Sequence, residues 1–180
     1  MERSISIASA PQTVFPLIND FHNWTMWSPW EGLDPAMKRT YGNVSAGTGA
    51  EYSWVGNDKV GEGKMTILES KPDSLVKIKL EFIKPFEETS ETTFTIAPQG
   101  PNTQVTWRRA GHNNFIAKVM SVFMDFEKMI GGDFDKGLGN LKGAAEKGAA
   151  PPSDTGPAPG ETTAPPSGAP TPPGPSPTSN

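Results

Sequence analysis

The chain has 180 residues and a formal net charge of −4, and it contains no cysteine. The absence of cysteine excludes disulfides, thiolate nucleophiles and cysteine metal sites, and the acidic balance argues against a nucleic-acid or anionic-lipid surface. No stretch approaches the ~18 apolar residues of a membrane span and the first residues do not resemble a secretory signal, so we expect a cytoplasmic protein.

The composition divides the chain near Gly148. Eleven of the nineteen prolines fall between Pro151 and Asn180, and that segment has no aromatic residue. Such a segment buries too little apolar surface to offset its ordering entropy. We therefore predict one folded domain over residues 1–147 and a disordered tail over 148–180. The tail is interpreted as a solubilising appendage, with a ligand for proline-recognition modules as the alternative.

The N-terminal residues predict a strand followed by short helical segments. Polar and apolar residues alternate over Arg3–Ala8, which is typical of a half-buried strand. Ser9 and Gln12 have the spacing of a capping box, so a short helix is expected directly after Ser9. Pro16 should bend that helix because it removes a backbone hydrogen bond. The tryptophan-rich run Phe21–Trp30 is interpreted as one irregular helical turn and a loop.

Turn residues divide the following stretch, up to about Gly111, into short segments of strand character. Alternation is clearest between Val76 and Phe82, which indicates one covered and one solvated face. Gly61–Lys64 lacks the frame of a phosphate-binding loop and is interpreted as a twisted or bulged strand. The short turns predict an antiparallel meander of six strands: Met37–Tyr41, Ala50–Val55, Lys64–Glu69, Leu75–Ile83, Glu88–Ala97 and Thr103–Ala110.

A long amphipathic helix is predicted from Phe115 to about Glu146, where apolar residues recur at three- and four-residue intervals. The pair Gly131-Gly132 should weaken or kink it. The resulting order is one strand, one or two short helices, six strands and a long helix, which belongs to the α+β class.

Four passages in this order resemble the START-like (SRPBCC) superfamily, especially its polyketide cyclase/dehydrase and lipid-transport branch. They are Ile5–Phe15, Ile18–Trp24 continuing to Trp27–Trp30, Val105–Trp107 and Asp133–Lys142. The resemblance implies a helix-grip fold, in which a curved antiparallel sheet of about seven strands wraps around the long C-terminal helix. An apolar cavity is then expected between sheet and helix.

The function implied by this resemblance is the binding of a small hydrophobic ligand (a lipid, a polyketide or an aromatic metabolite) by a carrier or sensor. The superfamily also contains enzymes and chaperone activators, so family membership alone does not decide the function. A polyketide cyclase/dehydrase-type enzyme is the first alternative, and a chaperone-activator-like interaction module is the second.

Strand parity and helix spacing select the side chains that would line such a cavity. Methionine adapts to irregular apolar shapes, which suits a ligand surface; the alternative is that these side chains simply fill the core. The candidate ligand-binding residues are Tyr52, Trp54, Met65, Ile78, Leu80, Phe94, Trp107, Arg109, Met120, Phe123 and Met124.

Arg109 has inward parity, counted from Val105 and Trp107, at a position where an apolar residue is expected. A buried guanidinium needs a partner because isolated buried charge is very costly. Glu88 also has inward parity, so an internal ion pair is one interpretation, and an anchor for a carboxylate or phenolate ligand is the other.

The two histidines, His22 and His112, lack the spacing of a metal site, and no nucleophile motif is present. His22 lies among acidic residues, so a general acid–base role competes with the interpretation of a surface histidine. His112 is interpreted as part of a turn that enters the long helix. We predict no metal and no cofactor, and we assign no catalytic residue.

Overall fold

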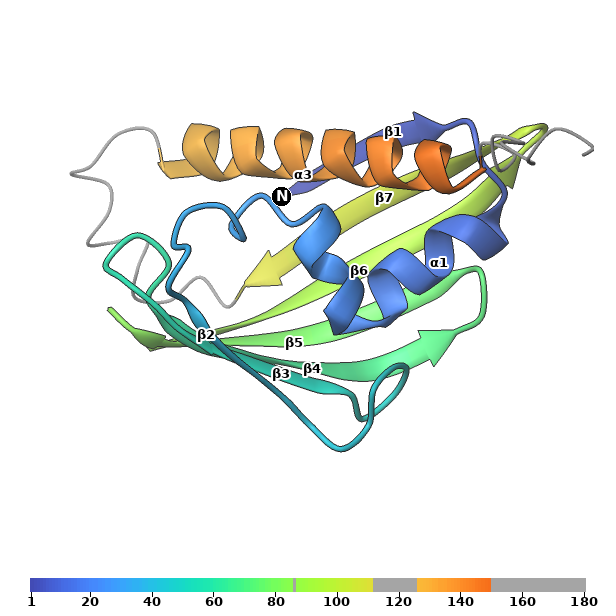
Figure 1. Cartoon of the computed structure of the whole chain (residues 1–180). Helices are drawn as coiled ribbons and strands as arrows, with labels where there is room; N and C mark the ends of the chain where they lie inside the picture. The colour runs from blue at the N-terminus through green and yellow to red at the C-terminus, as the bar shows by residue number, and fades with distance from the viewer. Residues whose placement is uncertain (86, 112–125, 150–180) are drawn as a thin grey trace, which may run out of the picture.

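The computed structural model describes residues 1–85, 87–111 and 126–149 (Figure 1). Its elements follow the predicted order, with a strand and short helices first, six further strands and a C-terminal helix. They are β1 (Glu2–Ile7), α1 (Pro11–Asn19), the 3-10 helix η1 (Phe21–Met26), β2 (Lys38–Tyr41), β3 (Glu51–Val55), β4 (Glu62–Lys71), β5 (Leu75–Lys84), β6 (Glu88–Gln99), β7 (Asn102–Gly111) and α3 (Phe126–Ala149).

The strands form one curved antiparallel sheet in the order β1-β7-β6-β5-β4-β3-β2. Helix α3 runs alongside β1 and β7, and α1 and η1 cover the concave side of the sheet (Figure 1). This arrangement confirms the predicted α+β helix-grip fold. The concave face is therefore the place where any site between sheet and helix would form.

One local prediction about the helices was wrong. Ala10, not Ser9, precedes α1, and no side chain caps the helix. The chain turns sharply after β1, with the Ser9 amide bonded to Ile7, so Ser9 lies too early to cap the helix. Helix α3 runs through Gly131 and Gly132 without a break, and the weakening or kink expected at this pair stays a prediction. The expected helical segment 115–125 lies outside the described residues.

The interpretation of Gly61–Lys64 as a bulged strand is confirmed. The pairing of β4 with β5 shifts register between Glu62 and Gly63. Gly61 has a φ of 65°, a left-handed conformation that glycine adopts without steric cost. The bulge lets β4 begin earlier than predicted and bends this end of the sheet.

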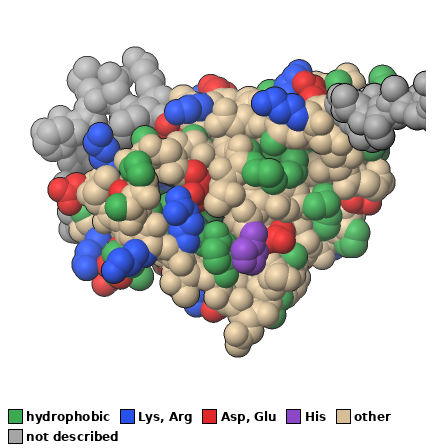
Figure 2. Space-filling model, in the orientation of Figure 1, with side chains coloured by type: hydrophobic (Ala, Val, Ile, Leu, Met, Phe, Trp, Pro, Cys, Tyr) green, Lys and Arg blue, Asp and Glu red, His purple; other side chains and the backbone are tan. Residues whose placement is uncertain are grey.

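The convex face carries charged side chains in short paired groups. Lys64 lies 2.6 Å from Glu51, and Lys79 lies 2.7 Å from Glu81. Such exposed pairs contribute about 1 kcal/mol or less each. On the face shown in Figure 2, basic and acidic side chains likewise lie close to one another. The charges therefore keep the outer surface solvated rather than defining a docking field of one sign.

The centre of the concave face is filled by aromatic rings. Trp107 stacks on Phe134 of α3 with ring centroids 4.1 Å apart and lies 4.8 Å from Phe94 of β6. Trp27, in the turn that follows η1, makes edge contacts with both Phe94 and Trp107. Because aromatic pairs contribute about 0.5–1.5 kcal/mol beyond their burial, this cluster joins sheet, turn and helix.

Side chains of α3 also contact the outer edge of β1. Asp135 pairs with Arg3 at 3.5 Å, Lys142 donates to the Ser6 carbonyl at 3.1 Å, and Glu146 accepts from the Ala8 amide at 2.8 Å. The helix is thereby fixed to β1 along more than two turns.

Candidate ligand-binding site

The strand register arranges the concave side chains in four rows that cross the sheet. The first row lies in the aromatic centre and the fourth lies near the β5–β6 hairpin. From first to fourth the rows are Trp107–Phe94–Val76, Arg109–Thr92–Ile78–Ile67, Ser90–Leu80–Met65–Tyr52 and Glu88–Phe82–Gly63–Trp54.

These rows bring together all the candidate residues that the structure describes in the sheet. Ile78, Phe94 and Trp107 are fully buried and Tyr52, Trp54 and Met65 are buried as well, whereas Leu80 in the third row and Phe82 in the fourth are only half-buried. The inner residues therefore act as core, and room for a ligand is expected toward the third and fourth rows. Met120, Phe123 and Met124 lie outside the described residues.

The β6–β7 side of the rows is polar. Arg109 donates to Glu88 at 2.6 Å and to the Ser90 hydroxyl at 3.1 Å. The two charged side chains are 15% and 27% exposed, so the pair is largely shielded from solvent. The internal ion pair predicted from strand parity is confirmed, and it balances the charge of the guanidinium.

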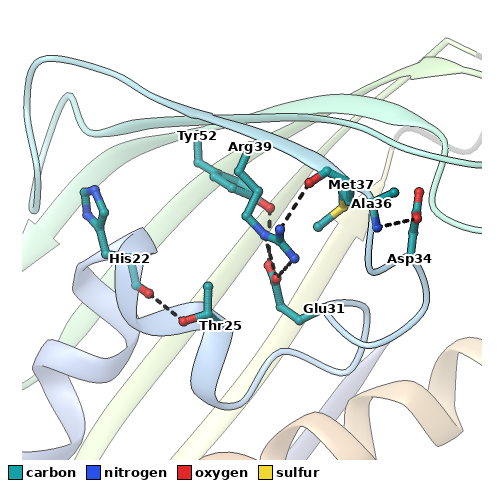
Figure 3. Close-up of polar contacts among 8 residues, drawn as sticks. All are labelled: His22, Thr25, Glu31, Asp34, Ala36, Met37, Arg39 and Tyr52. Carbon is teal, nitrogen blue, oxygen red and sulfur yellow. Dashed lines mark hydrogen bonds and ion pairs between the residues drawn. The ribbon is translucent and has the colours of Figure 1, made fainter.

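A second polar group lies at the β2–β3 side (Figure 3). Arg39 of β2 donates from Nε to Glu31 at 2.8 Å, and the Tyr52 hydroxyl donates to the other oxygen of the same carboxylate at 3.2 Å. Burial raises the pKa of Tyr52 above its usual value, and the nearby Glu31 carboxylate raises it further. Tyr52 is therefore a neutral donor at physiological pH.

Asp34 holds the loop that carries Glu31 in place. Its carboxylate accepts from the Ala36 amide at 2.9 Å and from the Asn57 amide at 2.7 Å, which ties the loop to the β3–β4 turn. Figure 3 shows Glu31 turned toward Arg39 and Tyr52 from this loop. The loop thus supplies one wall of the site.

The apolar side of the fourth row depends on Gly63, because a glycine has no side chain to fill the space. The Trp54 indole lies over Gly63, where an added Cβ would be 2.5 Å from the ring, and its nitrogen donates to the Val60 carbonyl at 3.0 Å. Phe82 meets the same ring edge-on at 5.7 Å. Beside this row, at the β5–β6 hairpin, lies a hollow of about 300 Å³ that is lined by Glu81, Phe82, Ile83, Glu87, Glu88 and Thr89 and is therefore largely acidic.

Sequence reasoning missed Glu31, Arg39, Ser90 and Thr92. Ser90 and Thr92 share the inward parity of Glu88, which was the signal available for them. Glu31 lies in an irregular loop, where no periodicity indicates which way a side chain points, so its partnership with Arg39 and Tyr52 could not be found.

His22 is a half-exposed histidine outside the rows. Its Nδ1 donates to the Asp20 carboxylate at 2.7 Å and its ring stacks on Tyr41 at 4.0 Å, while Thr25 donates to its carbonyl oxygen (Figure 3). This packing favours the interpretation of a surface histidine. Within residues 1–85, 87–111 and 126–149, no group of three or more His, Asp or Glu side chains is placed to hold a metal ion.

Fold and rows together define a helix-grip domain whose inner face combines apolar and polar strips. The chain belongs to the family described as polyketide cyclase/dehydrase and lipid transport, whose sequence profile matches residues 1–146. The resemblance to the SRPBCC superfamily is thereby confirmed. No curated protein sequence matches the chain significantly, and none of the helices in the described part is long and apolar enough to cross a membrane.

Solved structures share the fold at low sequence identity. The Aha1 dimer from Colwellia psychrerythraea matches with a TM-score of 0.59 and 15% identity, covering 82% of this chain and 96% of that one. A protein from Nitrosospira multiformis matches with 0.56 and 18%, covering 79% and 93%. Protein CV1439 from Chromobacterium violaceum matches with 0.53 and 12%, covering 81% and 96%. At these identities the similarity shows the fold alone.

Proposed function

We propose that this domain binds a small hydrophobic ligand, such as a lipid, a polyketide or an aromatic metabolite, and acts as a carrier or sensor. The ligand would lie on the third and fourth rows of the concave face. The description of the family, which includes lipid transport, supports this proposal.

The observation that carries the proposal is the composition of the third row. Tyr52 and Ser90 are its polar ends, and Met65 and Leu80 lie between them. These residues belong to four neighbouring strands, so the row spans about 14 Å at the usual strand spacing. A polar–apolar–polar row of this length suits a molecule with an apolar body and a few oxygen atoms, since ligand sites combine apolar walls with few polar groups.

The state of the polar groups favours a carrier over a cyclase that uses them. General acid–base catalysis works best when the pKa of the group lies near the operating pH. Burial moves the pKa of Tyr52 away from neutrality, and the guanidinium groups of Arg39 and Arg109 are each paired with a carboxylate. These groups are suited to holding a ligand rather than to transferring protons.

The proposal is tested by a substitution that fills the third row with a larger side chain. Leu80→Trp places an indole in the third row while keeping it apolar, and it should weaken binding of the neutral fluorescent probe N-phenyl-1-naphthylamine at least tenfold. Leu68→Trp is the matched control, because it is the same change at a 45% exposed position of the neighbouring strand β4, outside the rows. The measurement is probe fluorescence with the full chain, accompanied by circular dichroism to confirm folding.

Equal probe affinity in the two variants, or no probe binding by the unmodified chain, would contradict the proposal. A second measurement is mass spectrometry of gently purified protein. The proposal predicts that an apolar compound copurifies with the unmodified chain and is lost in Leu80→Trp.

A further inference from the structure

An ion pair lies at each end of the fourth row. By strand register, Arg39 of β2 lies opposite Trp54 and extends the row beyond it. Arg39 donates to the Glu31 carboxylate at 2.8 Å. At the other end, Arg109 reaches across from the second row and donates to Glu88 at 2.6 Å. The arginine at either end of the row is therefore already balanced by a carboxylate.

Both ion pairs are largely shielded from solvent. The side chains of Arg39 and Glu31 are 26% and 12% exposed, and Arg109 and Glu88 are shielded to a similar degree. Taking one partner away from such a pair leaves a costly unpaired charge. A ligand acid that competed for either guanidinium would strand Glu31 or Glu88 in this way. An acid that did not compete would lie beside a like charge, which is also unfavourable.

The hollow beside the fourth row offers an acid no counter-charge either. Glu81, Glu87 and Glu88 line it, and among the described residues that line it there is no lysine or arginine. The nearby Lys79 is engaged as well, because it pairs with Glu81 at 2.7 Å. An anion at this end of the rows therefore meets carboxylates rather than free cations, and like charges repel.

From these contacts we infer that the site rejects free acids and takes uncharged ligands, such as alcohols, ketones and esters with apolar bodies. Glu88 sets this specificity, because it neutralises the guanidinium that reaches the third and fourth rows. Between the two ion pairs, Phe82, Gly63 and Trp54 supply the apolar surface. This inference rests on the proposed function and narrows it to uncharged compounds.

Two fluorescent probes that share the same ring system test the inference with the full chain. N-phenyl-1-naphthylamine is uncharged, whereas 1-anilinonaphthalene-8-sulfonate has the same rings and a sulfonate that is ionised at neutral pH. The uncharged probe should bind the unmodified chain about tenfold more tightly or better, which corresponds to about 1.4 kcal/mol. Because the sulfonate also makes its probe more soluble in water, the decisive quantity is how a substitution changes the ratio of the two affinities.

Glu88→Gln keeps the shape of the side chain and leaves Arg109 without its counter-charge. It should raise the affinity for the sulfonate probe about tenfold or more and change that for the uncharged probe by less than about twofold. Glu91→Gln is the matched control, because it changes the net charge equally on the same strand, where Glu91 pairs with the convex Lys77. It should alter neither affinity. Adding Leu80→Trp to Glu88→Gln should abolish the gain, because the indole fills the third row.

The double variant Arg109→Met with Glu88→Gln covers the case in which Glu88→Gln alone does not fold, because it removes both charges of the pair together. Its affinity for the sulfonate probe should lie between those of the unmodified chain and Glu88→Gln, since the repulsion is lost but no free cation is gained. Circular dichroism checks the folding of each variant.

Three results would overturn the inference while the proposed function stands. The sulfonate probe binds the unmodified chain as tightly as the uncharged probe, the ratio of affinities stays the same in the folded variants of Glu88, or Glu91→Gln changes that ratio as much as Glu88→Gln does. If the uncharged probe does not bind the unmodified chain at all, the proposed function fails as well.

Discussion

Arg109 lies on the concave face of β7, in line with the buried residues Val105 and Trp107. Its guanidinium is held by Glu88 and Ser90 rather than by solvent. The parity of the strand predicted the inward direction of Arg109 and left two interpretations of its partner, of which the pair with Glu88 is the one observed. An inward charge on an otherwise apolar face needs an opposite charge beside it, because an unpaired charge there is too costly.

Arg109→Met should lower the free energy of unfolding by about 1–3 kcal/mol, between the values for an exposed pair and for a buried pair that loses one partner. The cost arises because Glu88 loses its counter-charge in a partly desolvated place. Adding Glu88→Gln should restore much of the loss. Urea denaturation of the single and double variants measures both effects. A double variant no more stable than Arg109→Met would show that the stranded carboxylate is not the cause.

Tyr52 provides a prediction about pH. Burial and the Glu31 carboxylate raise its pKa, and burial likewise raises the pKa of Tyr41. Tyrosine in the unfolded chain ionises near pH ~10, so the folded chain keeps these protons to higher pH. The contribution of the two protonated tyrosines to the free energy of unfolding is therefore complete below about pH 10 and is lost as the pH rises above it.

The chain has only two tyrosines, so phenolate absorbance reports on these two groups alone. The titration midpoint of the native chain should exceed that of the chain unfolded in urea, and Glu31→Gln should reduce the difference. Ionisation of both tyrosines at the unfolded value in the native chain would refute the prediction.

Strand β4 shows how the packing of a strand depends on a position that has no side chain. Glycine normally weakens a strand, and the sequence placed the start of this strand at Lys64. The strand begins two residues earlier, at Glu62, where its pairing with β5 shifts register, and the indole of Trp54 occupies the space beside Gly63. Periodicity located the strand, but its end was set by a contact with another strand, which a local pattern does not contain.

Gly63→Ala should destabilise the domain by about 1–3 kcal/mol, the usual cost of overpacking. The added Cβ would lie 2.5 Å from the Trp54 ring and 2.7 Å from the Glu81 carbonyl. Gly139→Ala in α3 is the matched control. Its Cβ would meet nothing within 4 Å, so helix propensity alone should stabilise the domain by about 0.5–1 kcal/mol. Thermal unfolding compares the two, and a neutral Gly63→Ala would mean that Trp54 repacks freely.

The limits of sequence reasoning at this scale follow from the loops. The alternation from Val76 to Phe82 predicted β5 within one residue of its observed bounds, because each side chain along a strand has a fixed direction. The segment after η1 has no period. The direction of the Glu31 side chain was therefore not predicted, and the polar group that it forms with Arg39 and Tyr52 was not found.

At the scale of the whole molecule, the division between domain and tail stays a prediction. Residues 150–180 lie outside the described part, whereas the matched family profile ends at residue 146. Truncation after Ala149, where α3 ends, should leave the free energy of unfolding within about 0.5 kcal/mol, as expected for changes away from buried contacts. A clear loss of stability in urea would show that the tail packs against the domain.

The contacts between α3 and β1 have a consequence for how copies of the chain meet. An open sheet has two edges, and each offers unpaired backbone groups on which another strand can add. Lys142 and Glu146 already bond the Ser6 carbonyl and the Ala8 amide at one end of the β1 edge, so a strand added there would have to displace these two side chains. The side chains of α3 thereby act as a guard that disfavours edge-to-edge aggregation at this end of the sheet.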